Sequence, residues 1–243
     1  MKTLVAIPVY NEVRHIVQVL DEVRKYADDI LAINDGSNDG SGDLLNQQKD
    51  LHLIHHNRNI GYGAALRSAF GYAQAHAYDV LVTMDSDGQH EAERIPVLLE
   101  ALTDEIDLVS GSRYLQTFTV NTIPPADRRR INFQLTKYLN QKLGLNITDS
   151  FCGFKAYRVH QLRKFHITEN GYGMPLQLWV QAANLGLRIT EVAVPLVYLD
   201  ANRTFGGGLD DAERRLAYYQ SVIEGELERI HPGQPQILEG LDV

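Results

Sequence analysis

Short apolar runs alternate with stretches of helical periodicity through the first half of the chain. The apolar runs predict strands at residues 3–9, 30–34, 51–55, 80–84 and 107–110, and helical spacing predicts helices at residues 12–26, 61–77 and 91–102. Strands and helices that alternate in this way form a mostly parallel sheet with helices on both faces. The expected fold class is therefore α/β.

The second half of the chain is less regular. Residues 151–158 predict a short strand, and apolar positions recur at helical spacing from Ile131 to Leu139 and over residues 209–230. We expect both stripes to pack on the core, and we leave a homodimer contact or a membrane-surface contact open for them. The predicted organisation is one domain over residues 1–230, closed by the helix at 209–230 and followed by a loose tail at 231–243.

The composition excludes several classes of protein. With 23 basic and 31 acidic residues the chain has a net charge of −8, which disfavours broad binding to nucleic acid. No apolar run approaches the roughly 18 residues that a membrane span needs, and the N-terminal segment is too short for a signal peptide. A single cysteine, Cys152, excludes an internal disulfide framework and is compatible with a reducing compartment. These features predict a cytoplasmic protein with a small-molecule partner, and they leave peripheral membrane contact open.

Polar residues follow three of the predicted strands at the point where each strand ends. Tyr10 and Glu12 follow the first strand, Asp35 follows the second, and Asp85 and Asp87 follow the run at 80–84. The carboxyl ends of parallel strands meet at one edge of a sheet, and ligands of such sheets bind beyond that edge. We therefore expect these three clusters to form a single site.

The pair Asp85 and Asp87 is the most specific of these signals. Two carboxylates this close repel each other unless a cation lies between them. Oxygen ligands of this kind suit Mg²⁺ or Mn²⁺, especially where a diphosphate supplies the remaining ligands. The alternative is a capped turn without a metal.

The other candidates each have two interpretations. The glycine-rich loop around Gly61 opens a helix, so its amides would approach a nucleotide or its small residues would serve close packing. Arg113 follows a strand, where it would bind phosphate oxygens or pair with a structural carboxylate. The run Arg128, Arg129 and Arg130 would likewise face a phosphate or form a solvated face.

Five motifs, taken in chain order, resemble those of the family-2 glycosyltransferases, and within that family those of the dolichyl- and polyprenyl-phosphate sugar transferases: Pro8–Glu12, Asn34–Ser41, Asn59–Gly63, Asp85–His90 and Gly111–Tyr114. The resemblance covers roughly residues 3 to 205. It implies a three-layer GT-A fold that is Rossmann-like, a sugar donor linked to GDP or UDP, a divalent cation (Mg²⁺ or Mn²⁺), and inversion at the anomeric carbon.

The resemblance also implies roles for individual residues. The nucleoside pocket would be lined by Pro8, Tyr10, Glu12 and Asp35, with Gly61 in the donor site. The metal and the diphosphate would be surrounded by Asp85, Asp87 and Gln89. Three arginines would face the phosphates of donor or acceptor: Arg113, Arg129 as the chosen member of its run, and Arg203.

A physical argument favours a phosphate acceptor. A phosphomonoester has a second pKa of about 6 and is already a dianion near neutral pH, so it needs no general base to become nucleophilic. We therefore expect transfer of a hexose to a polyprenyl phosphate, with Asp87, Arg113 and Arg129 as the catalytic residues. The alternatives are transfer to a soluble hydroxyl or glycan acceptor, a non-catalytic nucleotide-sugar binding protein, and a nucleotidyltransferase.

Overall fold

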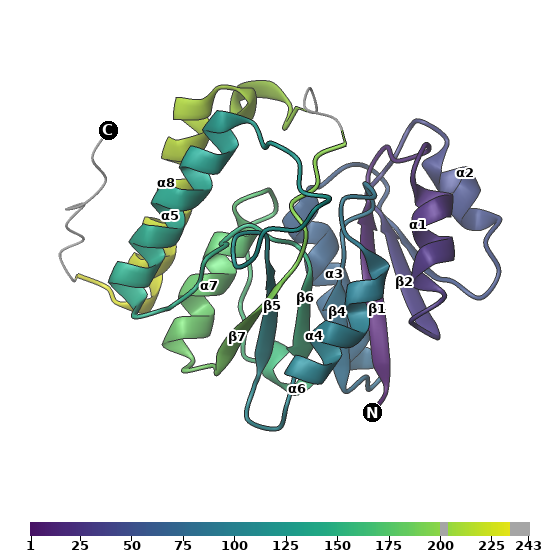
Figure 1. Ribbon diagram of the computed structural model, residues 1–243, viewed down its shortest axis with the longest axis horizontal. Helices are drawn as coiled ribbons and strands as arrows, with labels where there is room; N and C mark the ends of the chain where they lie inside the picture. Colours follow the sequence, from purple (N-terminus) through teal and green to yellow (C-terminus); the bar gives the residue numbers. More distant parts are fainter. Residues whose placement is uncertain (200–203, 234–243) are drawn as a thin grey trace.

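The computed structural model describes residues 1–199 and 204–233, and within them the centre is a seven-stranded sheet (Figure 1). Its strands are β1 Thr3–Val9, β2 Asp29–Asn34, β3 His52–His55, β4 Val80–Thr83, β5 Leu108–Ser112, β6 Lys155–Arg158 and β7 Ile189–Ala193. They lie in the order β3-β2-β1-β4-β6-β5-β7, and β6 runs antiparallel to both of its neighbours while the other pairs are parallel. The expected mostly parallel sheet is confirmed.

Helices cover both faces of the sheet, because successive strand residues point to opposite sides. In β1, Leu4 and Ala6 belong to one buried cluster, whereas Val5, Ile7 and Val9 belong to the other. The second cluster includes side chains of α1 Ile16–Val23, α2 Ser41–Asn46 and α4 Ile95–Ala101, which follows a 3-10 turn at Ala92–Arg94. The first cluster includes side chains of α3 Tyr62–Ala75, α5 Ala126–Leu143, α6 Val159–Leu162, α7 Met174–Asn184 and α8 Ala212–Ile230. The result is the three-layer α/β arrangement that the sequence predicts.

Several details differ from the sequence-based expectation, among them helices α2 and α6 and strand β7, which were not predicted. Helix α1 begins at Ile16 and not at residue 12, because Asn11 has a φ of 57° and the carbonyl of Glu12 closes a turn with the N–H groups of His15 and Ile16. Helix α7 was not predicted. Every residue from Met174 to Ala182 is buried, and a helix that is buried all round shows no amphipathic stripe.

Both amphipathic stripes of the second half pack on the core. Ile131 and Leu135 of α5 are buried, as are Tyr219 and Ile223 of α8, which follows a 3-10 turn at Gly207–Asp210. These faces are therefore not available to a membrane or to a second copy. None of the described helices combines the length and the apolar composition that crossing a bilayer requires. The predicted loose tail falls largely on residues 234–243, outside the described residues.

Candidate active site

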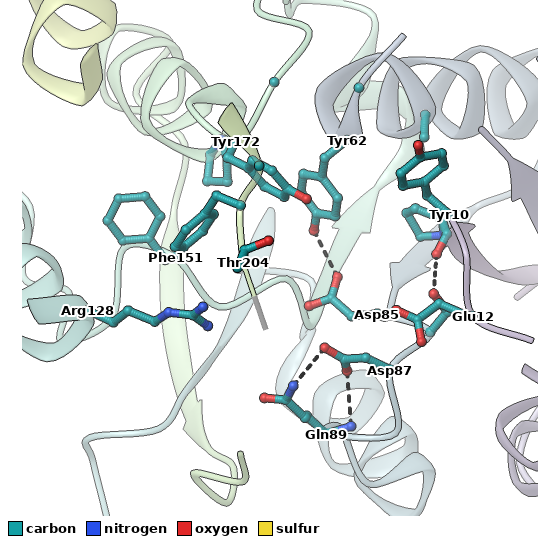
Figure 2. A pocket seen from close by; sticks show the side chains of 18 of the residues that line it. Tyr10, Glu12, Tyr62, Asp85, Asp87, Gln89, Arg128, Phe151, Tyr172 and Thr204 are labelled. Carbon is teal, nitrogen blue, oxygen red and sulfur yellow. Dashed lines mark hydrogen bonds between the residues drawn. The ribbon is translucent and has the colours of Figure 1, made fainter. Parts of the chain in front are cut away.

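A cavity of about 560 Å³ lies beyond the carboxyl ends of the strands (Figure 2). It brings together most of the residues that the sequence singles out: Pro8, Tyr10, Glu12, Asp35, Gly61, Asp85, Asp87, Gln89 and Arg113. Arg128 lines this cavity, whereas Arg129 is exposed and does not. Arg203 lies outside the described residues. In Figure 2, Arg128 lies on one side, Tyr10 and Glu12 lie on the other, and Asp85 and Asp87 lie between them.

Asp85 is held where β4 ends by contacts with three different parts of the chain. Its Oδ1 atom accepts a hydrogen bond from the Tyr62 hydroxyl at 3.0 Å. The backbone at Gly153 passes so close that a Cβ atom there would lie 2.6 Å from Oδ1 and 2.7 Å from Oδ2. The ring of His90 places Nδ1 3.7 Å from Oδ2. Burial lowers the pKa of His90. The charge of Asp85, the contact with Cys152 and the charge of Asp87 outweigh burial and raise the pKa to about 9.

Gln89 contacts Asp87 and fixes its orientation. The backbone N–H of Gln89 donates to Oδ1 of Asp87 at 3.1 Å, and the side-chain Nε2 donates to Oδ2 at 2.9 Å. Because an amide nitrogen cannot ligate a cation, only Oε1 of Gln89 is left for the ligand role that the resemblance implies. In residues 1–199 and 204–233, His, Cys, Asp and Glu side chains form no group of three that suits a metal. The donor set nevertheless fits Mg²⁺ or Mn²⁺ as these ions bind with substrate, with one or two carboxylates and the remaining ligands from phosphates and water.

Asp35 is almost fully buried and holds the glycine-rich loop in place. Its carboxylate accepts hydrogen bonds from the N–H groups of Ile60 at 3.1 Å and Gly61 at 2.9 Å, and it lies 2.7 Å from Nδ1 of His56. Gly61 has a φ of 107°, and a Cβ atom there would overlap the carbonyl oxygen of Asn170. The structure shows the close packing, and these two amides bind Asp35, whereas a nucleotide contact at Gly61, which lines the cavity, stays a prediction.

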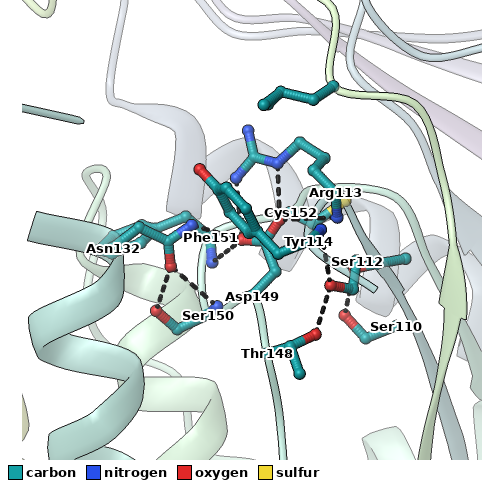
Figure 3. A network of polar contacts seen from close by, with 12 residues as sticks. Ser110, Ser112, Arg113, Tyr114, Asn132, Thr148, Asp149, Ser150, Phe151 and Cys152 are labelled. Atoms are coloured by element: carbon teal, nitrogen blue, oxygen red, sulfur yellow. Dashed lines mark hydrogen bonds and ion pairs between the residues drawn. The ribbon is translucent and has the colours of Figure 1, made fainter. Parts of the chain in front are cut away.

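Arg113 forms a bidentate ion pair with Asp149 (Figure 3). Its Nε lies 2.6 Å from Oδ2 and its Nη2 lies 2.9 Å from Oδ1, and Asn132 donates a further hydrogen bond to Oδ1 at 2.8 Å. Burial raises the pKa of Asp149, but the Arg113 guanidinium holds it well below its usual range. The structure therefore shows the ion pair with a structural carboxylate, in an arginine that also lines the cavity.

Side chains of β7 and α7 hold the loop that carries Asp149. Glu191 accepts hydrogen bonds from the N–H groups of Thr148 at 2.8 Å and Asp149 at 3.2 Å. The indole of Trp179 donates to the carbonyl of Ser150 at 2.9 Å. Sequence reasoning missed Asp149 and Asn132, because neither follows a predicted strand and the contacts of Asp149 with Arg113 and Asn132 are long-range.

Arg128 reaches the cavity from the first turn of α5. Its guanidinium lies 4.6 Å from the ring centre of Phe205, and the buried Arg215 lies at the same distance from that ring. Arg215 is paired in turn with Asp127. Arg128 and Asn132 are four residues apart on one face of α5, whereas Arg129 is turned about 100° away from them. We call Arg113, Arg128 and Asn132 the arginine end of the cavity, and Glu12, Asp35, Asp85 and Asp87 its carboxylate end.

The profile of the family Glycosyl transferase family 2 matches residues 4–165, about two thirds of the chain. The chain belongs to this family. The membership confirms the enzyme class that the motifs predict.

Two relatives match this glycosyltransferase over most of its length. Undecaprenyl-phosphate mannosyltransferase of Micrococcus luteus is 34% identical over 223 residues, which cover 87% of the chain and 91% of the relative. Polyprenol monophosphomannose synthase of Mycolicibacterium smegmatis is 32% identical over 242 residues, which cover 94% of the chain and 89% of the relative.

Solved structures of other glycosyltransferases share the fold. Glucosyl-3-phosphoglycerate synthase of Mycobacterium tuberculosis, in complex with Mn²⁺, UDP and phosphoglyceric acid, aligns with a TM-score of 0.70 at 20% identity, over 96% of this chain and 79% of that one. Mannosyl-3-phosphoglycerate synthase of Rubrobacter xylanophilus aligns with a TM-score of 0.70 at 14% identity, over 100% of this chain and 79% of that one. At these identities the likeness concerns the fold alone, and it agrees with the expected GT-A architecture.

Proposed function

We propose that this glycosyltransferase moves a hexosyl residue from a nucleoside diphosphate sugar to the phosphate of a polyprenyl phosphate, with inversion at the anomeric carbon. The nucleoside would lie at Pro8, Tyr10 and Glu12, and the diphosphate would lie at Asp85 and Asp87. The acceptor phosphate would lie at the arginine end.

The observation that carries the proposal is the separation of charge within the cavity. Among the described residues that line it, the carboxylates are Glu12, Asp35, Asp85 and Asp87. These follow β1, β2 and β4, whereas Arg113 follows β5 and Arg128 lies in α5. Among the described lining residues, the arginine end thus offers cations and an amide and has no carboxylate of its own.

This separation suits a phosphate acceptor better than a hydroxyl acceptor. A hydroxyl group needs a base to remove its proton in the transition state, and the arginine end has none among its described lining residues. A phosphate dianion needs no base, and it needs cations to offset its repulsion from the donor diphosphate. Arg128 supplies that charge. Arg113 lines the cavity with its charge paired to Asp149, and Asn132 donates a hydrogen bond to that carboxylate.

A divalent cation would be held by Asp85 and Asp87, with Gln89 keeping the second carboxylate oriented. Bound there, it would stabilise the negative charge that develops on the departing nucleoside diphosphate. The chain's own contribution is to orient the two carboxylates. The hydroxyl of Tyr62 and the backbone at Gly153 fix Asp85, and two hydrogen bonds from Gln89 fix Asp87. The names of the two relatives support a polyprenyl phosphate acceptor and a mannosyl donor.

The experiment that tests the proposal is a transfer assay with GDP-linked and UDP-linked hexoses and three acceptors: a water-soluble short-chain prenyl phosphate, the matching prenyl alcohol, and a soluble glycan. Of the three acceptors, we expect only the prenyl phosphate to give a glycosylated product, a glycosyl phosphate, with release of nucleoside diphosphate. Transfer to the prenyl alcohol or the glycan would contradict a phosphate acceptor. Release of inorganic diphosphate would indicate a nucleotidyltransferase.

A matched pair of variants makes the assay specific for the arginine end. Arg128→Gln removes the cation that faces the cavity, and Arg129→Gln removes its exposed neighbour. At acceptor concentrations below KM, we expect strongly reduced transfer in the first variant and wild-type transfer to the short-chain acceptor in the second. Equal effects would contradict the assignment of Arg128.

A further inference from the structure

Large apolar side chains are exposed beside the mouth of the cavity. Ile123 is 92% exposed and Leu199 is 60% exposed. Their segments lie side by side, because the N–H group of Tyr198 donates to Oγ1 of Thr122 at 2.7 Å. Tyr198 itself lines the cavity. Together with two further exposed side chains of the same loop, Leu115 and Val120, these residues form what we call the apolar rim.

The solvent-facing side of α5 also exposes a large apolar side chain. Phe133 is 72% exposed on the side of the helix that points away from the core, and Arg129 and Lys137 stand one turn before and one turn after it. We call these three residues the outer face of α5. The helix begins three residues after Ile123, so the outer face follows the apolar rim directly along the chain.

Positive charge is concentrated in the same part of an acidic protein. Of the six basic residues in 108–148, Arg129 and Lys137 are exposed on the outer face of α5, whereas Arg113 is paired with Asp149 and Arg130 with Glu213. An anionic lipid surface attracts such a segment with about 1 kcal/mol for each basic residue near it. Exposed phenylalanine and isoleucine beside basic residues are the composition of interfacial membrane contacts.

We propose that the apolar rim and the outer face of α5 dock on an anionic lipid bilayer, with Ile123 and Phe133 entering the headgroup region. The inference rests on the proposed function, because a polyprenyl phosphate is held in such a bilayer. Docking at the mouth of the cavity brings its phosphate to Arg128. A second copy of the chain fits this surface less well, since a two-fold contact would set Arg129 and Lys137 against the same cations.

Vesicle binding of the full chain tests this surface. We expect it to sediment with vesicles of phosphatidylcholine and phosphatidylglycerol, and weakly with phosphatidylcholine alone. Ile123→Asp and Phe133→Asp should each reduce the partition coefficient about tenfold or more, because each removes a large apolar side chain from the headgroup region. Arg129→Glu should reduce binding to the anionic vesicles about fivefold for each unit of charge lost.

Val17→Asp is the matched control. Val17 is an exposed valine on α1, at the opposite end of the molecule from α5 (Figure 1). The variant adds the same charge at a distance from the surface, so binding should stay at the wild-type level. Equal losses in all the aspartate variants, or a wild-type chain that stays in the supernatant, would overturn the proposal.

Two further measurements separate this inference from the proposed function. With the water-soluble prenyl phosphate, Ile123→Asp and Phe133→Asp should keep wild-type turnover, and with a long-chain acceptor in vesicles they should lose it. If the wild type binds vesicles but transfers no sugar to any prenyl phosphate, the proposed function is wrong and the membrane-docking surface is still supported. If the wild type is a dimer that both variants dissociate while vesicle binding is unchanged, the surface is a subunit interface and the inference is wrong.

Discussion

The two ends of the active-site cavity are built in different ways. At the carboxylate end, each side chain lies within four residues of the end of a strand, and Asp87 is oriented locally by Gln89, two residues away. At the arginine end, Arg113 is held by Asp149, which lies 36 residues further along the chain, and Asn132 from α5 donates a hydrogen bond to that carboxylate. A local arrangement survives the loss of one side chain, whereas a buried long-range network does not. A substitution of Asp87 should therefore affect catalysis alone, and substitutions in the Arg113–Asp149 network should also affect stability.

The largest expected effect is at the carboxylate end. Asp87→Asn removes the charge that the proposed cation requires and keeps the shape of the side chain. We expect turnover to fall by roughly 10³-fold, because a metal at a leaving diphosphate contributes several kcal/mol to the transition state. The free energy of unfolding, measured by urea denaturation of the same preparation, should not fall. A variant that unfolds more easily, or one with full activity, would contradict this picture of the carboxylate end.

The contrast between the ends also decides what could be predicted from the sequence. The alternation of strands and helices placed β1, β2 and β4 correctly, and side chains that follow parallel strands must meet at one edge. Asp35, Asp85 and Asp87 were therefore visible as one site. The role of Gln89 was expected as a ligand, whereas its amide nitrogen binds Asp87.

The arginine end could not be predicted in the same way. Which arginine of the run faces the cavity depends on the rotation of α5 about its axis, because successive helical residues point about 100° apart. The sequence does not fix that rotation, and Arg129 was chosen over Arg128. Asp149 has no local signal, since its contacts with Arg113 exist only after β5 and the loop before β6 have packed together. Helix α7, which supports that loop through Trp179, is buried on every side and so shows no periodicity.

The second prediction tests the arginine end. Asp149→Asn leaves Arg113 without its ionised partner in a site where the carboxylate is fully buried. Breaking a buried ion pair costs about 3–5 kcal/mol, and for a protein of this size that lowers Tm by about 10 °C. Calorimetry and urea denaturation measure the loss. The double variant Arg113→Met with Asp149→Leu, which removes both charges, should recover part of the stability but none of the activity.

The third prediction separates Arg128 from the network beside it. Arg128→Ala should raise the KM for a short-chain prenyl phosphate by about tenfold to a hundredfold, because a hydrogen bond to a charged group contributes about 1.5–3 kcal/mol. Among the described residues it contacts the rings of Tyr198 and Phe205, which are only partly buried, so Tm should change little. Arg129→Ala, assayed on the same soluble acceptor, should behave as the wild type. A large fall in Tm for Arg128→Ala would mean that the whole arginine end is structural.

The smallest expected effect concerns the other end of β5, where Asp107 pairs with Arg188 at 3.0 Å. The hydrogen bonds from Arg188 lower the pKa of Asp107 to about 2, against the effect of burial. A carboxylate whose pKa is lower in the folded state stabilises the protein above its unfolded pKa of about 3.9, and it loses that contribution as the pH falls towards 2. Asp107→Asn should therefore have a lower urea midpoint than the wild type at pH 6, and the difference should shrink between about pH 4 and pH 2. Asp104→Asn, at a fully exposed carboxylate, should show no such convergence. A constant difference for Asp107→Asn would mean that the Arg188 contact stabilises the fold through packing and not through charge.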